Sequence, residues 1–546
     1  MVQSEDLLKQ LLETIETLNQ ASIQLYEMIS SENKTCNQFI ALMMEMLTKM
    51  QPLLQQLSTE EPALKAHLMC KNATSSLGNI AVLKDLSSQN ACQKIEFELL
   101  PLTNELYVDL YFWGLCYPDE KKMWNYYRTE MPEMCPLPAP PINGAYPYEI
   151  SIVVVAYNKL EYTKECIKSI EKYFPQSISH ELILINNGSN DGTREYFESL
   201  HPDKQIDICC NTKSFSVASR VVEGRYTLFV SNDVIITPDA VKNMLTCIQS
   251  DESIGFVVPV CPNIANLQPI PANYSTIEEM ISFAKKNNKC DPFRWEQRAR
   301  LCSPAVLARS DSAALHSFMG YLYPFYPERF LAFTDDLMSL VARRNGLKCI
   351  LAKDAYVHHF GSVTIREAAQ KQRTLYADGC REFERSFGIN PWGTGFCFDP
   401  LLMQTLSPQD SGPVNILGIN CGMGDNPLKI KGILRETQKN QTVYIYNLSD
   451  QVKYKKDLES VSDHFLLVQK WSQINKFFPD ITFSYIIVED IDVQESAVKM
   501  IGKLFARLTL GGKMAIKSTQ ESLKNSLLGI YNKLEQINSW IILKKS

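Results

Sequence analysis

The chain has 546 residues, which is too many for a single hydrophobic core and predicts three or four domains. Charged residues make up 21% of the sequence and hydrophobic residues 45%, as in an ordinary soluble globular protein. The net charge of −6 argues against a nucleic-acid-binding protein, because such a protein carries a surplus of Lys and Arg.

The sequence indicates neither a membrane anchor nor a disulfide framework. No apolar run reaches the roughly 18 residues that a membrane-spanning helix needs, and "MVQSEDLLKQ" at the N-terminus is not a signal peptide. The 16 cysteines are scattered and form no CxxC pair, so a zinc ribbon is not expected either. We therefore expect a cytoplasmic protein with reduced thiols.

Residues 1–60 are predicted to form a helical hairpin or a coiled coil. Apolar residues step by three and four from Leu8 to Ile29, with Ser22 as the one polar member of the seam. After a polar break, Pro52 is expected to kink a second seam, formed by Phe39, Met43, Met46, Met50, Leu53 and Leu57. The pattern allows a homo-oligomer through these helices without requiring one.

The next two segments carry no chemical motif. Residues 61–130 look mostly helical, and residues 131–147, "MPEMCPLPAPPINGAYP", are rich in proline and predict a linker. A strand pattern begins directly after this linker, so we place a domain boundary there.

Residues 148–395 alternate between apolar strands and amphipathic helices. "ISIVVVA" at 150–156 and "ELILIN" at 181–186 predict buried parallel strands, with helices over 162–173 and from Thr193 onward. This alternation predicts an α/β domain with a largely parallel sheet. Ligands of such sheets gather at the carboxyl ends of the strands.

Five polar clusters occur in this domain. They are "AYNKLEY" (156–162), "NNGSNDGT" (186–193), "SNDV" (231–234), "TDDL" (334–337) and "VHHFGSVT" (357–364). In order and spacing they resemble family 2 glycosyltransferases of the GT-A fold, over roughly residues 148–390. The resemblance implies a Rossmann-like nucleotide-sugar domain that transfers a sugar to a hydroxyl acceptor.

The resemblance also implies that the first two clusters bind the nucleotide. Ala156 and Tyr157 would pack against it, and Asn158 would hold the turn. Asn186 stands where the family has an aspartate that reads a uracil or thymine ring, and an amide can still hydrogen-bond a base edge. Gly188 permits the tight turn that follows.

The third and fifth clusters are expected to hold a divalent metal ion. Transfer from a nucleoside diphosphate sugar requires neutralisation of the diphosphate as it leaves, which Mn²⁺ or Mg²⁺ can supply. By resemblance, Asp233 is the metal ligand in the place of the family's DxD motif, and His359 completes the site. Ser231 replaces the first carboxylate, and with Asn232 it would contact the donor. We therefore expect weak metal binding until the diphosphate is present.

The fourth cluster is expected to supply the catalytic base. A carboxylate must take the proton of the acceptor hydroxyl during attack on the anomeric carbon. The resemblance places this base at Asp335, with Asp336 beside it in the first turn of a helix, where the helix dipole also favours acidic residues. Trp295 and His316 are candidate residues of the acceptor cleft.

Residues 410–546 are expected to form a further, smaller Rossmann-like domain. "ILGINCGMGDN" at 416–426 resembles motif I of class I S-adenosylmethionine-dependent methyltransferases. Three positions depart from the family: Gly418 replaces an aspartate, Asn420 a glycine, and Asn447 the acid that grips the cofactor ribose. A degenerate methyltransferase-like domain that does not bind S-adenosylmethionine is favoured, and an active methyltransferase or a site for another ligand are the alternatives.

Together these features predict a metal-dependent, inverting glycosyltransferase that uses a UDP- or dTDP-sugar. Its combination with a methyltransferase-like tail resembles bacterial glycosyltransferases of flagellin and other surface proteins, so a protein acceptor is favoured. The alternatives are a glycosyltransferase of surface polysaccharide such as O-antigen or capsule, a bifunctional glycosyltransferase and methyltransferase, and a non-catalytic assembly scaffold. The joint presence of Asp233, Asp335, Asp336 and His359 argues against the scaffold.

Overall fold

The computed structural model describes most of the chain, in two compact units. The described residues are 2–31, 35–60, 66–95, 146–207, 222–310, 333–361, 374–406, 413–439, 441–490, 495–518, 520–531 and 534–545, with isolated positions between 99 and 122 and at 218. All but the last two residues of the expected linker lie outside them. Unit 1 comprises Met1–Leu160, Ser179–Thr227 and His316–Leu331, and unit 2 comprises Glu161–Ile178, Leu228–Leu315 and Ala332–Ser546.

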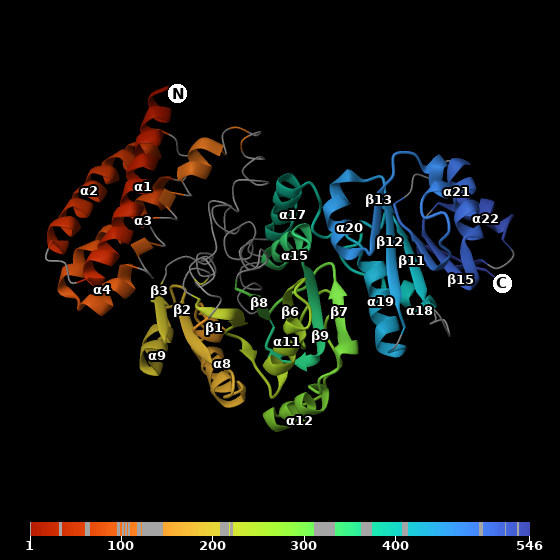
Figure 1. Ribbon diagram of the computed structural model, residues 1–546, viewed down its shortest axis with the longest axis horizontal. Coiled ribbons are helices and arrows are strands. Elements are labelled where there is room, and N and C mark those ends of the chain that lie inside the picture. The colour runs from red at the N-terminus through yellow and green to blue at the C-terminus, as the bar shows by residue number, and fades with distance from the viewer. Residues whose placement is uncertain are drawn as a thin grey trace. The chain divides into compact units, whose positions relative to one another are not determined.

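Unit 1 begins with helices that pack on one another. They are α1 (Val2–Ser30), α2 (Cys36–Glu60), α3 (Ala66–Val82) and α4 (Ser88–Lys94), with short helical turns at η2 (Leu83–Asp85) and η4 (Tyr111–Cys116). Helix α1 contacts α2 and α4, and α2 contacts α3, as the red and orange ribbons of Figure 1 show. The seam of α1 is buried, including Ser22, whose hydroxyl donates to the Leu18 carbonyl at 2.8 Å.

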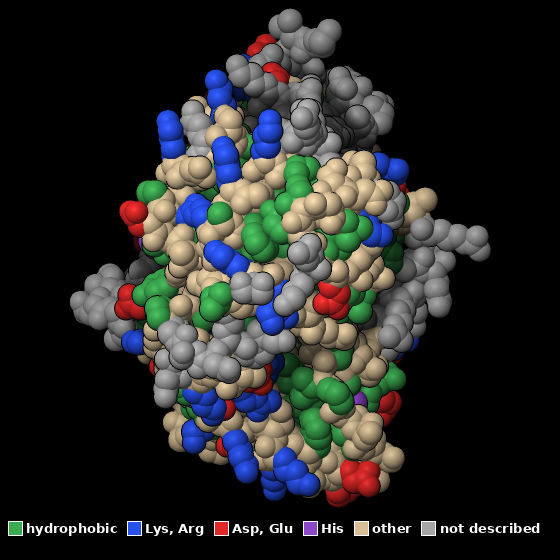
Figure 2. All heavy atoms as spheres, turned by 90° about the vertical axis from the view of Figure 1, so that its right-hand side faces the viewer, with side chains coloured by type: hydrophobic (Ala, Val, Ile, Leu, Met, Phe, Trp, Pro, Cys, Tyr) green, Lys and Arg blue, Asp and Glu red, His purple; other side chains and the backbone are tan. Residues whose placement is uncertain are grey.

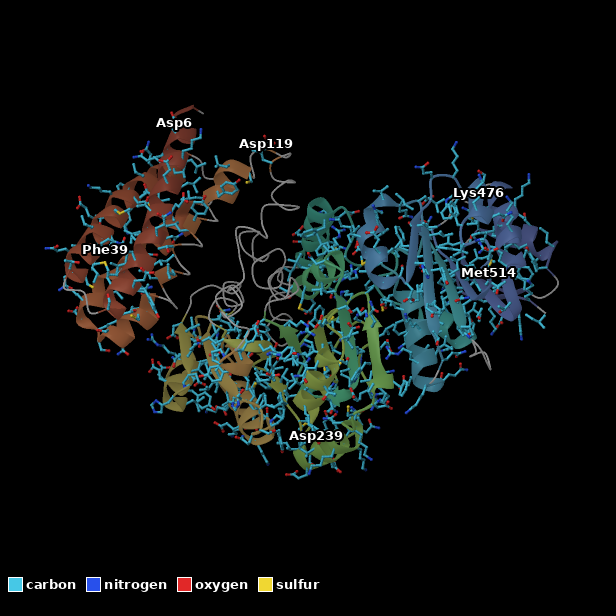
Figure 3. The ribbon with its side chains drawn as sticks, in the orientation of Figure 1. Asp6, Phe39, Asp119, Asp239, Lys476 and Met514 are labelled. Carbon is cyan, nitrogen blue, oxygen red and sulfur yellow. The ribbon has the colours of Figure 1, made fainter. Side chains whose placement is uncertain are left out.

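The expected seam of α2 is wrong at three of its six positions. The buried positions are Ile40, Met43, Leu47, Met50, Leu54 and Leu57. Phe39 (labelled in Figure 3), Met46 and Leu53 are only partly buried beside this stripe. At each of these places two adjacent apolar residues satisfy the helical spacing, and packing against the neighbouring helices selects the second. The helix also continues through Pro52.

The other elements that the structure describes in unit 1 include a layer of parallel strands. Strands β1 (Tyr148–Ala156), β2 (His180–Asn186) and β3 (Lys204–Asp207) lie in the order β3-β2-β1, and β1 lies beside β4 (Gly224–Ser231). Helix α9 (Thr193–Leu200) follows β2. Their register aligns Ala156 with Asn186 and Asn186 with Asp207. The three strands therefore end side by side, which brings together the polar turns that follow them.

Strand β4 (Gly224–Ser231) begins in unit 1 and ends in unit 2, where the order is β4-β8-β6-β9-β7. These strands are β6 (Ile254–Val260), β7 (Trp295–Arg298), β8 (Ala305–Arg309) and β9 (Lys348–Tyr356). A separate two-stranded sheet pairs β5 (Val234–Ile235) with β10 (His358–His359). The helices are α8 (Leu160–Tyr173), α11 (Ala240–Gln249), α12 (Ile277–Asn287), η6 (Pro292–Arg294), α15 (Thr334–Arg344), α17 (Leu375–Phe387) and α18 (Pro400–Thr405).

The remainder of unit 2, from Val414 onward, is a second α/β layer, here called the C-terminal domain. Its strand order is β13-β12-β11-β14-β15-β17-β16, in which β17 is antiparallel to its neighbours. The strands are β11 (Val414–Ile419), β12 (Val443–Ser449), β13 (His464–Leu467), β14 (Phe483–Val488), β15 (Leu508–Lys517), β16 (Leu534–Ile537) and β17 (Trp540–Lys544). The helices are α19 (Asp425–Thr437), η8 (Val452–Tyr454), α20 (Lys455–Val461), η9 (Trp471–Lys476), α21 (Glu495–Ala506) and α22 (Glu521–Leu528).

This domain is doubly wound, because the strand order reverses between β11 and β14. Figure 1 shows α19 and α20 on one side of the sheet and α21 and α22 on the other. Met514 of β15, labelled in Figure 3, lies in the buried apolar core beneath α21. On the face shown in Figure 2, hydrophobic side chains are separated by polar and charged ones, which is ordinary for a protein surface.

Two features of the described residues bear on the expected environment. None of their helices is both long and apolar enough to cross a membrane. The described cysteines are free thiols, and many of them, such as Cys166 and Cys349, are buried.

The packing of α2 is testable with a pair of leucine variants. Leu47→Ala removes a fully buried side chain and should destabilise the helices by about 2–5 kcal/mol, whereas Leu42→Ala removes a side chain that is 58% exposed and should cost less than about 0.5 kcal/mol. Hydrogen–deuterium exchange of peptides from α1 and α2 in the full chain should accelerate only in the first variant. Equal exchange in the two variants would contradict the corrected seam.

Candidate active site

The turns that follow β1 and β2 are tied together by hydrogen bonds. The backbone N–H of Asn158 donates to Ser189 Oγ, and Asn158 Oδ1 accepts from the N–H of Asn190, both at 2.8 Å. Asn158 has a φ of 56°, which asparagine tolerates better than most residues, and Gly188 has a φ of 79°. Tyr157 is 40% exposed on this rigid edge.

Asn186 at the end of β2 is engaged within the chain at both ends of its amide. Its Nδ2 donates to Asp207 at 2.8 Å, and its Oδ1 accepts from the N–H of Ser189 at 3.0 Å. The side chain of Asp207, at the end of β3, is 35% exposed. Asp207 therefore places a carboxylate at this edge of the sheet, where Asn186 has an amide. Ala156, the neighbouring residue of β1, is fully buried. Asp207 was not among the site residues predicted from the sequence, although a strand that ends on an aspartate is a signal for such a residue.

In unit 2, the pairing of β5 with β10 brings Asp233 and His359 together. His359 lies opposite Val234 in this pairing. His359 Nε2 is 3.3 Å from Asp233 Oδ2, and the two side chains are 5% and 14% exposed. The N–H of Phe360 donates to the Asp233 carbonyl at 3.1 Å, which holds the two segments in this register.

This pair fits two ligands of one divalent ion. Adjacent ligands of an octahedral ion with bonds of about 2.1 Å lie about 3.0 Å apart, close to the separation of the two atoms. In the part of the chain that the structure describes, no group of three or more His, Cys, Asp or Glu side chains could hold a metal. The described residues would therefore leave most coordination positions of the ion to other ligands.

The residues before Asp233 are anchored to helix α8. Asn232 Nδ2 donates to Thr163 Oγ1 at 2.9 Å, and the Ser231 carbonyl accepts from Cys166 Sγ at 3.7 Å. Ser231 itself is exposed. The amide of Asn232 thus serves to hold the turn, and this contact was not evident from the sequence.

Asp335 and Asp336 begin helix α15 and have different surroundings. Asp336 is 3% exposed and forms a two-pronged contact with Arg300, in which Nη2 donates to Oδ2 at 3.0 Å. Asp335 is partly buried, and its Oδ1 accepts from both the N–H and the Oγ of Ser303, at 3.1 and 2.8 Å. No described residue donates to Oδ2 of Asp335. Of the two carboxylates, only Asp335 therefore keeps an oxygen for a substrate.

Burial changes the acidity of both carboxyl groups. Burial raises the pKa of Asp335, and this rise is opposed by the hydrogen bonds from Ser303 and by the charges of Arg300 and His359. Burial also raises the pKa of Asp336, to about 6, against the opposing charge of Arg300. Since His359 affects the pKa of Asp335, the expected metal ligand and the expected base lie within electrostatic range of each other.

An aromatic cluster supports β10 on its other face. Tyr274 Oη bonds to His358 Nδ1 at 2.5 Å and to the hydroxyl of Tyr356. Phe360 contacts the rings of both His358 and Tyr162, with centroids 4.7 and 4.8 Å away. Burial lowers the pKa of His358, which favours the neutral imidazole. No role for Tyr274 was evident from the sequence.

The expectation that Trp295 lines an acceptor cleft is wrong. Trp295 is only 8% exposed, and its Nε1 donates to both carboxylate oxygens of Asp354 at 3.0 Å. An indole needs a partner for its N–H when it is buried, and Asp354 supplies it. His316 lies outside the described residues.

Residues 151–295 match the model of Glycosyl transferase family 2. This segment contains the expected nucleotide turns and Asp233, and it ends before Asp335 and His359. No curated protein is significantly similar to the chain.

Solved structures of glycosyltransferases resemble part of the chain at low identity. GalNAc-T7, solved with UDP, GalNAc and Mn²⁺, is 12% identical with a TM-score of 0.30, over 39% of this chain and 43% of its own. A Pyrobaculum calidifontis mannosyltransferase, solved with GDP-Man and Mn²⁺, is 14% identical with a TM-score of 0.30, over 49% and 70%. Glucosyl-3-phosphoglycerate synthase from Mycobacterium tuberculosis, solved with Mn²⁺, UDP-glucose and glycerol 3-phosphate, is 16% identical with a TM-score of 0.29, over 46% and 83%. The chain thus spans less than half the length of GalNAc-T7.

Proposed function

We propose that this protein, whose residues 151–295 match the model of Glycosyl transferase family 2, is a metal-dependent, inverting glycosyltransferase with a UDP- or dTDP-sugar donor and a hydroxyl acceptor. One observation carries the proposal. Asp233, His359 and Asp335 come from three separate segments and lie in one unit. Asp233 and His359 are paired, and His359 lies within electrostatic range of the partly buried carboxylate of Asp335.

Asp233 and His359 are proposed to bind the divalent ion. A bound Mn²⁺ or Mg²⁺ supplies positive charge that stabilises the departing diphosphate. The two side chains provide one carboxylate oxygen and one imidazole nitrogen, and the low exposure of both keeps them in place. The remaining positions suit the oxygens of the donor diphosphate and water.

Asp207 is proposed to select the base of the donor. The N3–H of uracil or thymine is a hydrogen-bond donor and requires an acceptor, which a partly exposed carboxylate provides. Asn186 holds Asp207 through its Nδ2 at 2.8 Å, so the amide orients the carboxylate while Asp207 contacts the ring. Tyr157 offers an exposed ring at the same edge for packing against the base.

Asp335 is proposed to act as the general base. Its carboxylate takes the proton from the acceptor hydroxyl, the hydroxyl oxygen bonds to the anomeric carbon, and the bond to the diphosphate oxygen breaks on the opposite face. This single displacement inverts the anomeric configuration. Oδ2 is the oxygen that receives the proton, because Oδ1 is held by Ser303.

The acceptor is proposed to be a protein, such as flagellin or another surface protein. Support comes from the architecture, in which helices precede the glycosyltransferase domain and a second α/β domain follows it. Transfer to an isolated glycan but to no protein would replace it with the polysaccharide-assembly alternative.

The base assignment is testable by nucleotide release from a panel of UDP- and dTDP-sugars in the presence of Mn²⁺. Asp335→Asn should lower kcat by roughly 10²- to 10⁴-fold, because the amide cannot accept the proton. The control is Glu278→Gln, which removes an exposed carboxylate from the first turn of α12 and should leave the rate unchanged. Full activity of Asp335→Asn would exclude this residue as the base.

The dependence of kcat/KM on pH provides a second test. Activity requires the ionised form of Asp335, so kcat/KM should fall as the pH decreases through its pKa. Ser303→Ala removes the Oγ donor that stabilises the carboxylate, which raises the pKa of Asp335 and should move the acid limb to higher pH. Ser199→Ala, on the exposed face of α9, is the control. An acid limb that stays in place in Ser303→Ala would argue against Asp335 as the titrating group.

Metal binding should depend on the nucleotide. Because the described residues offer only the pair Asp233 and His359, we expect weak Mn²⁺ binding alone and tighter binding with UDP, and Asp233→Asn should abolish this gain. Calorimetry with and without UDP measures it. Equally tight Mn²⁺ binding in both conditions would show a site that the chain completes by itself.

A further inference from the structure

The glycine-rich turn of the C-terminal domain is filled by the chain itself. This turn, residues 422–425, donates the N–H of Met423 to the Thr394 carbonyl and the N–H of Asp425 to the Gly395 carbonyl, both at 3.1 Å. A Cβ on Gly422 would lie 1.9 Å from the Thr394 oxygen. A turn of this kind at a helix N-terminus usually offers its N–H groups to a ligand. Here the donors are taken and the backbones touch, so S-adenosylmethionine does not fit this turn.

Asp425, the first residue of α19, points its carboxylate into the glycosyltransferase part of unit 2. It is fully buried and accepts from Arg298 at 3.1 Å and from the Ala299 N–H at 2.7 Å. It also accepts from the Phe398 N–H at 2.9 Å. The motif that predicts a cofactor site therefore fixes a contact between two parts of the same unit.

A second buried carboxylate of the C-terminal domain holds the end of helix α15. Asp457 of α20 is fully buried and accepts from Arg343 at 2.8 Å and from Arg344 at 3.3 Å. The Arg343 guanidinium also donates to the carbonyl of Ala299. Arg343 thus joins α15 to both α20 and the segment after β7.

The three residues Arg298, Ala299 and Arg300 connect these contacts to the start of α15. Arg298 contacts Asp425, and Ala299 bonds to Asp425 through its N–H and to Arg343 through its carbonyl. Arg300 bonds to Asp336, next to Asp335.

Buried ion pairs of this kind contribute little net stability, because desolvation offsets much of their attraction. They do disfavour alternative arrangements, since a shift of the helix would leave a buried charge without its partner. Two such pairs, through Asp336 and Asp457, involve residues of α15, and a third, through Asp425, holds Arg298 in the segment before Arg300. Their arrangement is suited to fixing the position of this helix.

We propose that the C-terminal domain is a clamp on helix α15, and that Asp425 and Asp457 are positioning residues for Asp335. The domain holds both ends of α15. At the C-terminal end of this helix, Asp457 binds Arg343 and Arg344. At the N-terminal end, Asp425 fixes the segment 298–300, whose Arg300 binds Asp336. The inference rests on the proposed role of Asp335 as the base. It assigns the C-terminal domain to the glycosyl transfer reaction instead of to a second reaction.

The test compares Asp457→Asn with Glu459→Gln in the full chain. The control residue lies on the same helix, where its carboxylate is 47% exposed and, among the residues that the structure describes, pairs only with Lys455 of α20. We expect Asp457→Asn to accelerate hydrogen–deuterium exchange in residues 334–344 and to lower kcat roughly 10- to 100-fold, with the KM for the donor unchanged. Asp457→Glu, which keeps the charge, should recover part of the rate.

Unchanged exchange in residues 334–344 of Asp457→Asn would overturn the clamp, whatever the activity. If Asp457→Asn does not fold, Arg344→Gln is the second variant, because it removes the partly exposed partner of Asp457. This variant must also accelerate exchange in residues 334–344 and lower kcat, both by a smaller amount. Normal exchange in Arg344→Gln overturns the proposal. Protection of residues 422–425 by S-adenosylmethionine would show an open turn and would also overturn it. Because exchange is measured without substrate, failure of the clamp is distinguishable from failure of the glycosyltransferase assignment.

Discussion

The buried pair between Arg300 and Asp336 is the interaction on which the geometry of the site depends. It fixes the first turn of α15, which contains Asp335. Oδ1 of Asp335 then accepts from Ser303, and Oδ2 has no donor among the described residues. Two adjacent aspartates at a helix start would otherwise be equivalent, since both are favoured by the helix dipole. The arginine makes them different by burying one and leaving the other partly accessible.

The proposed donor site also depends on a small number of side chains whose positions are fixed by neighbouring residues. Asp233 and His359 form a pair that the β5–β10 register sets and the aromatic cluster around His358 supports. As the proposed metal ligands, this pair would bind the ion weakly by itself, so the ion and the nucleotide would enter together. Ser231 takes the position of a second carboxylate in the proposed site, and the donor diphosphate would supply the negative charge that Ser231 lacks.

Local patterns in the sequence were sufficient to predict much of the fold. The apolar runs that end at Ala156 and Asn186 are strands, and the acidic pair at 335–336 begins a helix, because strand ends and helix starts have strong local signals. The contacts across the chain were not accessible in this way. Nothing near Arg300 or Arg343 in the sequence indicates its partner. Trp295 was assigned to a cleft, although it is buried and its N–H donates to Asp354. The turn at 422–425 looked like a cofactor site because the carbonyls that fill it are distant in sequence. On α2, neighbouring apolar residues left the buried face ambiguous until its partner helices were known.

The most direct test of the site is anomalous scattering at the manganese edge from crystals grown with Mn²⁺ and UDP. We expect a single strong peak within about 2.3 Å of both Asp233 Oδ2 and His359 Nε2, with diphosphate oxygens completing the shell and no comparable peak in crystals of Asp233→Asn. A peak away from these two side chains, or an ordered UDP with no metal at this pair, would contradict the proposed active site.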